Sequence, residues 1–319
     1  MPPKIDPNIH QRRVSRMLLE TWIVMSALIA ANVLIEIYSA QLGDLYLPLM
    51  ILGLVLQGGW FHRLYTAAHE AIHKKLIPSS KLLNDIVGQA LLTPLLIPVP
   101  IYRKIHKFHH THNRRDHHTS TLDGYVVNKE PGFLRRVWIG LCWYIGVFAG
   151  GYFLHGVVSI LLFLFVPPKY APKISPAFNG WSLQDQLNSI AIFAGCVLLN
   201  VLIYTLLGSH IWWAMMGRPL LFFAWIYSLF VYIYHYRTTY GEQVIYNVRS
   251  VDTPRFFKWW LLNFSHHRVH HRYPTLPWHM LPDEDAPLPE AFQHNENVDT
   301  LLGAVLQQSA GPEIFVEPK

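Results

Sequence analysis

The sequence predicts an all-α integral membrane protein with about four transmembrane helices in two hairpins, plus interfacial helices and a histidine-rich cap on the cytoplasmic side. Its side chains are 51% hydrophobic and only 14% charged, whereas soluble proteins carry about 25% charged residues. Long apolar segments recur between residues 17 and 236 without a Ser/Gly/Pro-rich linker, which favours a single domain over residues 1–319. We expect its core at residues 17–281 and a peripheral tail at 282–319.

Two pairs of apolar segments are predicted to cross the membrane as out-and-back hairpins. Segments 17–39 and 45–61 form the first pair and are joined by the short turn 40–44. Segments 187–207 and 220–236 form the second pair. A spanning helix needs about 20 apolar residues, and each of the four segments approaches that length.

Two further apolar segments, 82–101 and 137–166, are predicted to begin and end on the same side of the membrane, as re-entrant or interfacial helices. Pro94, Pro98 and Pro100 favour this for the first segment, because a straight spanning helix tolerates few prolines. The alternative is that 137–166 crosses once and that one of the later segments lies in the interface.

The distribution of Lys and Arg predicts the orientation in the membrane. The turn 40–44 has neither residue and segment 208–219 has only Arg218, while the other connections are rich in both. Cytoplasmic loops hold the positive excess, so we expect both termini and all histidine clusters on the cytoplasmic side. The net charge of +6 then indicates a bilayer as partner and no nucleic acid, because the basic residues alternate with membrane segments.

Histidines gather in three clusters on this predicted cytoplasmic side. His69 and His73 lie at i and i+4, on one helical face. The other two clusters each contain an H-x-x-H-H pattern, which is predicted to place three imidazoles on one helical face. Eight ring nitrogens are therefore expected to converge; they belong to His69, His73, His106, His109, His110, His267, His270 and His271.

Eight imidazoles are more than one first-row transition metal can use, so two metal ions are predicted. Structural zinc takes four ligands and catalytic zinc three, which makes iron for oxygen chemistry the better fit. Ferritin-type di-iron sites use Glu-x-x-His ligands, but Glu70 is the only carboxylate within a cluster. The predicted cofactors are two non-haem Fe ions with O2 as co-substrate. No dinucleotide-binding motif is evident, so electrons must come from an external donor, either ferredoxin-like or a small haem protein.

The three clusters resemble the histidine boxes of the integral-membrane fatty acid desaturase and hydroxylase superfamily, over residues 60–281. The segment His270-His271-Arg272-Tyr273-Pro274 and the following Pro277-Trp278 are also similar to that family. The resemblance implies a long-chain acyl substrate and His235 as a ninth iron ligand. Some members hold a water with an asparagine one turn before that histidine; here Val231 stands there, and either Asn263 substitutes or the site differs.

The spacing of the first box leaves the substrate class open. It has three residues between its two histidines, unlike the four of acyl-CoA-type desaturases. In this it is closer to desaturases of lipid-linked acyl chains, to carotenoid ketolases and, in the following Lys74, to alkane hydroxylases. Candidate acceptors for the ring N–H groups of the ligands are Glu70, Asp116 and Asp123. His112 and His266, adjacent to the second and third boxes, are either further ligands or hydrogen-bond donors beside them.

The resemblance ranks fatty acid or lipid desaturation first. Hydroxylation or ketolation of a hydrocarbon or carotenoid, and oxidative decarboxylation of a fatty acid to a terminal alkene, are alternatives. A different class, a membrane zinc metalloprotease, is also open because His69-Glu70-Ala71-Ile72-His73 spells H-E-x-x-H. Leu122-Asp123-Gly124 matches the L-D-G of such proteases, but this interpretation leaves six histidines of the other clusters unexplained.

Overall fold

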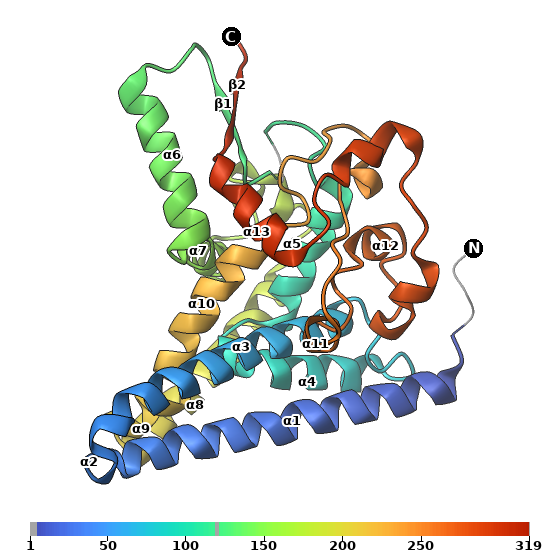
Figure 1. Cartoon of the computed structure of the whole chain (residues 1–319). Helices are drawn as coiled ribbons and strands as arrows, with labels where there is room; N and C mark the ends of the chain where they lie inside the picture. The colour runs from blue at the N-terminus through green and yellow to red at the C-terminus, as the bar shows by residue number, and fades with distance from the viewer. Residues whose placement is uncertain (1–4, 119–120, 319) are drawn as a thin grey trace. The chain divides into compact units, whose positions relative to one another are not determined.

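The structure, a computed structural model, describes residues 5–118 and 121–318 and is mostly helical (Figure 1). The chain folds into two compact units, each assembled from two separate stretches. The first unit contains the residues up to Tyr102 together with Ser159–Ile226, and the second contains Arg103–Val158 together with the residues from Tyr227 onward. The units are therefore not successive domains along the chain, and the single domain over residues 1–319 stays a prediction.

The first unit consists of helices. Its long elements are α1 (Pro7–Ile37), α3 (Tyr46–Ile72), α4 (Lys81–Leu92) and α8 (Leu183–Leu207), and its short ones are α2 (Ser39–Leu42), η1 (Gly43–Leu45), η2 (Thr93–Leu95), η3 (Ala171–Lys173), η4 (Pro176–Phe178), α9 (Ser209–Trp212) and the π-helical η5 (Trp213–Gly217). Three helices belong in part to each unit: α5 (Val99–His112), α7 (Gly151–Phe165) and α10 (Arg218–Phe230).

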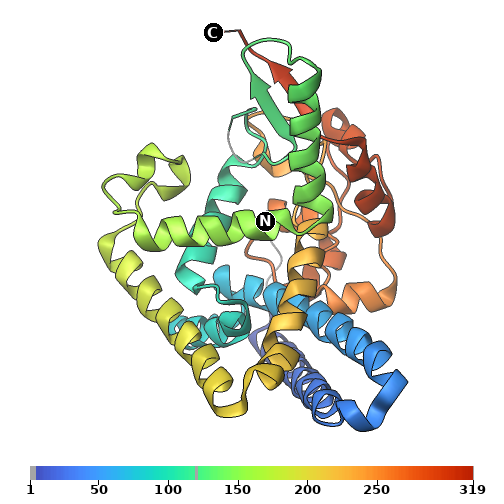
Figure 2. The same ribbon diagram turned by 90° about the vertical axis from the view of Figure 1, so that its left-hand side faces the viewer.

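The predicted first hairpin is present as α1 and α3, which lie side by side (Figures 1 and 2). The Trp60 indole donates to the Thr21 carbonyl at 2.9 Å. Asn32 Nδ2 donates to the Gly53 carbonyl at 3.2 Å, and a Cβ on Gly53 would collide with the Asn32 amide. A glycine is thus required at this contact between the two helices, as at many membrane helix crossings.

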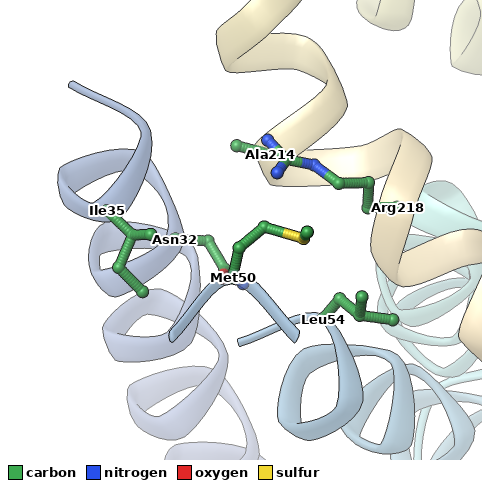
Figure 3. Close-up of a pocket in the computed structure, with 6 residues that line it drawn as sticks. All are labelled: Asn32, Ile35, Met50, Leu54, Ala214 and Arg218. Carbon is green, nitrogen blue, oxygen red and sulfur yellow. The ribbon is translucent and has the colours of Figure 1, made fainter. Parts of the chain in front are cut away.

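Polar residues inside the predicted span 17–39 have partners within the first unit. Glu36 accepts from the Arg218 guanidinium and, at 3.1 Å, from the Tyr46 hydroxyl. Asn32 and Arg218 also line a small pocket together with Ile35, Met50, Leu54 and Ala214 (Figure 3). Pairing of this kind lowers the free-energy cost of holding charges and amides within apolar helices.

Among the described residues, three helices are long and apolar enough to cross a membrane: Pro7–Ile37, Ser39–Ile72 and Leu183–Leu207. Two bent pairs, Lys81–Leu95 with Val99–His112 and Phe133–Phe148 with Gly151–Phe165, pass the same test only when each pair is taken together, which raises the number to five. The predicted number of about four falls within this range and remains a prediction.

The bent pairs are the two segments predicted to be re-entrant or interfacial. The first breaks around Pro94 and Pro98, with Leu96 in the left-handed region at φ 58°. The second breaks at Gly150, which has φ 85°, and its two helices meet at 88°. Each is a broken span or a re-entrant loop, so both interpretations of segment 137–166 stay open.

The predicted crossing 220–236 differs from the structure. Helix α10 ends at Phe230 and turns follow over residues 231–237, so this segment is not among the helices of spanning length in the described part of the chain. The apolar pattern continues past Phe230 because Tyr232 and Tyr236 are buried in a core of the second unit, together with Trp143, Val147 and Leu229. Burial against protein, not lipid, explains their apolar character.

The second unit combines short helices with one pair of strands. Its elements are β1 (Gly124–Val127), α6 (Phe133–Phe148), η6 (Val244–Tyr246), α11 (Arg255–Trp260), α12 (His267–Arg272), η7 (Trp278–Glu284), η8 (Glu290–Asn295), α13 (Leu301–Gln307), η9 (Gln308–Ala310) and β2 (Glu313–Val316). Strands β1 and β2 pair in parallel, with Gly124 opposite Glu313 (Figures 1 and 2). The tail expected to be peripheral thus supplies a strand, and the Trp143 indole donates to its Gln308 carbonyl at 2.8 Å.

Candidate metal centre

Helix α5 carries the second histidine cluster into the second unit. His106 and His110 are one turn apart, and their Nε2 atoms lie 2.8 Å from each other. His109 belongs to another contact, since its Nε2 atom lies 3.2 Å from Nε2 of His271. The three rings of this H-x-x-H-H pattern therefore divide into a pair and a single ring.

Helix α12 divides its histidines in the same way. Nε2 of His270 lies 2.9 Å from Nε2 of His110, while His267 and His271 face His109 and His235. All three α12 rings are buried, with exposed fractions of 1–3%. Within the second and third boxes, the ring at i+3 therefore belongs to a different group from the rings at i and i+4.

His235 comes from the turn that follows α10. Its Nε2 atom lies 3.1 Å from Nε2 of His267, and its ring centroid is 4.7 Å from that of His109. Two groups of converging ring nitrogens result in the second unit. One consists of His109, His235, His267 and His271, whose ligand atoms all lie within 4.8 Å of one another, and the other contains His106, His110 and His270 under the same limit.

The donor set of the four-histidine group fits a metal ion. Nδ1 of His235 lies 3.1 Å from the Asn247 carbonyl, so this nitrogen has its contact outside the group. Nε2 faces the other rings and lies 3.1 Å from Nε2 of His267, the position that a metal-binding nitrogen requires. Burial lowers the pKa of His271 and of His235 well below the usual range, and neighbouring imidazoles lower them further. Neutral rings are the form that binds metals.

Asn113 and Asn247 were not predicted and hold His235 in place. Nδ2 of Asn113 lies 2.9 Å from Nδ1 of His235 and donates to the Asn247 carbonyl at 2.7 Å. Asn247 Nδ2 donates to the Arg114 carbonyl at 3.0 Å. The position of Asn113, directly after the second cluster, could have indicated it, whereas nothing in the sequence around Asn247 points to this contact.

The first cluster lies in the first unit, at the end of α3. The rings of His69 and His73 are 4.7 Å apart at their centroids. Glu70 lies between these histidines in the sequence and accepts from the buried Lys75 ammonium at 3.0 Å. A Glu70 carboxylate oxygen lies 3.8 Å from Nδ1 of His69. The two rings share one helical side, as their spacing predicts.

The other predicted site residues have different partners. Asp123 accepts from Arg114, from Thr121 and from the Arg237 backbone N–H. Asn263 donates to the Trp278 carbonyl at 3.1 Å, and the exposed Asp116 accepts from the His118 backbone N–H at 2.8 Å.

His112 and His266 stand outside both groups. The His112 ring stacks on Phe108. His266 Nδ1 lies 2.8 Å from Asp285, which also accepts from Arg268 at 2.9 Å. Neither histidine belongs to a group of converging ring nitrogens.

The geometry weakens the protease interpretation of Asp123. Its two carboxylate oxygens are occupied by the Arg114 side chain and the Arg237 backbone, and its exposed fraction is 0%. A carboxylate held in this way is the counter-ion of a buried arginine and has no free oxygen to complete a zinc site.

A comparison with protein families gives an independent result. The model of the fatty acid desaturase family matches residues 45–298, most of the chain, which confirms the predicted resemblance. The match begins within the first hairpin and includes all three histidine clusters and His235. No curated protein matches the chain.

Proposed function

The chain belongs to the fatty acid desaturase family, and from that premise we propose that it is a membrane oxidoreductase that uses two iron ions and O2 to desaturate a long acyl chain. The observation that carries this proposal is the pair of converging imidazole groups in the second unit. Imidazole suits iron, and a set of nitrogen donors without carboxylates argues against magnesium or calcium.

We propose His69 and His73 as iron ligands as well. Support for this comes from the sequence, because the pair forms the first of the three histidine boxes. The second unit would supply three nitrogen ligands to one iron, from His106, His110 and His270, and four to the other, from His109, His235, His267 and His271. Asp123 and Asn263 receive no ligand role in this assignment.

The chemistry that bound iron would supply is the activation of O2, so that two hydrogens leave neighbouring carbons while an external ferredoxin-like or small haem donor provides two further electrons. The residues of the chain prepare the site for this. The Asn247 carbonyl and the Asn113 amide contact Nδ1 of His235 and so orient its ring. Burial of the His267, His270 and His271 rings keeps water from the ligands and favours their neutral form.

The lipid bilayer is the proposed setting of the reaction. The three apolar helices of spanning length support membrane integration. The excess of Lys and Arg in the connections that carry the histidines supports a cytoplasmic position of the clusters and of both termini. An acyl chain dissolved in the bilayer would then reach the site from the lipid side.

The test supplies the purified, iron-loaded chain with a reductant system and with free and esterified acids of about 10–18 carbons, a range sized to a hydrocarbon core about 30 Å thick. We expect about two irons per chain and a product lighter by two hydrogens. Addition of oxygen would instead identify hydroxylation or ketolation, and loss of carbon dioxide would identify oxidative decarboxylation. His271→Ala serves as the inactive control.

One result would refute the proposal outright. A single zinc ion that survives both His110→Ala and His271→Ala, without O2 consumption, would identify the membrane metalloprotease. That enzyme would bind its zinc through the H-E-x-x-H pair and a third ligand outside the other two clusters, which would have no role in binding its metal.

A further inference from the structure

Arg249 is a fully buried cation in the second unit, with an exposed fraction of 0%. In the part of the chain that the structure describes, no acidic side chain pairs with it. Its Nε donates to the Ile233 carbonyl at 2.9 Å, and its Nη1 donates to side-chain oxygens of Asn297 and Gln307, both at 2.7 Å. Burial lowers the pKa of Arg249 to about 10, so the guanidinium is charged at neutral pH. Burying a charge whose hydrogen-bond partners are all neutral has a large free-energy cost. The burial of Arg249 therefore needs an explanation.

The backbone around Arg249 runs beside the turn that carries His235. The Arg249 N–H donates to the Tyr234 carbonyl at 2.9 Å, and the Asn247 carbonyl lies 3.1 Å from Nδ1 of His235. With the Nε bond to Ile233, these contacts tie residues 247–249 to residues 233–235. Any displacement of Arg249 therefore shifts the carbonyl that orients His235.

Residues 297–311, which we call the C-terminal brace, also contact the turn that carries His235. Within the brace, the Gln308 side chain donates to the Leu229 carbonyl at 2.9 Å, and the Gly311 carbonyl accepts from the Tyr236 hydroxyl at 2.6 Å. The brace also runs beside the Arg249 segment, since the Asp252 N–H donates to the Asp299 carbonyl. It thus reaches both ends of the turn as well as the arginine.

We propose that Arg249 is a positioning residue that connects the C-terminal brace to His235, so that the four-histidine group has its metal-binding geometry only when the brace is docked. This inference rests on the proposed function, because it supposes that the two groups bind metal. It adds a role for a segment far from the histidine boxes. Arg249 itself would touch neither metal nor substrate.

The test is a titration of the full-length, detergent-solubilised chain with Co2+ alone, followed by ligand-field absorption and by metal analysis. Loss of a residue that orients a metal-bound histidine typically weakens metal binding by about 10–100-fold. We expect Arg249→Gln to bind one Co2+ at least about tenfold more weakly than the wild-type chain, with the other unchanged. Arg249→Lys keeps a cation but loses the Nε bond, and its effect should be intermediate.

Variants in the brace keep the inference testable if Arg249→Gln does not fold. Gln307→Leu removes one of the two Nη1 acceptors and should selectively weaken the same Co2+. Leu302→Ala is the matched control on α13, because Leu302 is 68% exposed, and it should bind both ions like the wild-type chain.

The outcomes separate this inference from the proposed function. Equal weakening of both ions in Arg249→Gln and Gln307→Leu, or no weakening of either, would overturn the positioning role while two ions still bind to the wild-type chain. A wild-type chain that binds no Co2+ would overturn the proposed function and this inference with it.

Discussion

Replacing Asp123 by Asn should destabilise the second unit without removing a metal ligand. Asp123 and Arg114 both have exposed fractions of 0%, and they form an ion pair. Arg114 has a second acidic partner, Glu313 of β2 at 3.1 Å, and its guanidinium lies 3.8 Å from the centroid of the Tyr240 ring. The substitution therefore leaves a buried cation with partial compensation.

The magnitude follows from these contacts. Removing one partner of a buried ion pair costs about 3–5 kcal/mol, and the remaining contacts of Arg114 favour the lower end for Asp123→Asn. One kcal/mol lowers the Tm by about 2–4 °C in a unit of this size. We expect a fall of about 6–12 °C for Asp123→Asn and a larger fall for Arg114→Met, which leaves the Asp123 carboxylate buried without its cation.

The assay is thermal unfolding of the detergent-solubilised chain, with bound metal measured on the same sample at low temperature. Glu130→Gln is the matched control. It removes an exposed ion pair with Arg136, in which the side chains are 73% and 54% exposed, and such pairs contribute about 0–1 kcal/mol. If Asp123→Asn lost its metal at an unchanged Tm, Asp123 would be a ligand and our account of it would be wrong.

Three further predictions follow from the geometry. His106→Ala and His109→Ala should each abolish tight binding of one metal, and of different metals, because their rings belong to different groups; metal analysis of both variants and of the double variant tests this. Gly58→Ala should destabilise the first unit by about 1–3 kcal/mol, measured by thermal unfolding, since a Cβ there would lie 2.7 Å from that of Phe222. Burial would raise the pKa of Asp285, but bonds from His266 and Arg268 outweigh burial and lower this pKa. The contribution of the Asp285 carboxylate to the free energy of unfolding is therefore complete at neutral pH and is lost as the pH falls below about 4. Asp285→Asn should reduce this loss of stability at acid pH in unfolding measurements from pH 3 to 7.

Local signals in the sequence predicted much of the fold. The turn 40–44 and the prolines of segment 82–101 determine the backbone conformation at their own positions. The first hairpin and the break after α4 could therefore be inferred directly from the sequence. The end of α10 could not, because the tyrosines after Phe230 are as apolar as lipid-facing residues and only the tertiary core distinguishes them.

The site could be predicted to the extent that its residues repeat at helical spacing. Histidines at i, i+3 and i+4 are recognisable in the sequence by their spacing. His235 was predicted from the family resemblance alone. The contacts that hold His235 join residues far apart in the chain, such as Asn113 with Asn247 and Arg249 with Asn297. No periodicity marks such pairs, and their residue types occur throughout polar loops.

The division of the second and third histidine boxes between two groups has a simple geometric cause. Successive helical residues are rotated by about 100°, so i and i+4 diverge by only about 40°, while i+3 lies about 100° from i+4 on the other side of i. One H-x-x-H-H helix therefore presents a pair of rings in one direction and a single ring in another. In helices α5 and α12, the pair of each helix faces the single ring of the other. His106 and His110 of α5 face His270. His267 and His271 of α12 face His109. Two such helices facing each other generate two groups at once, so the two metal ions of the proposed function would require both copies of the pattern.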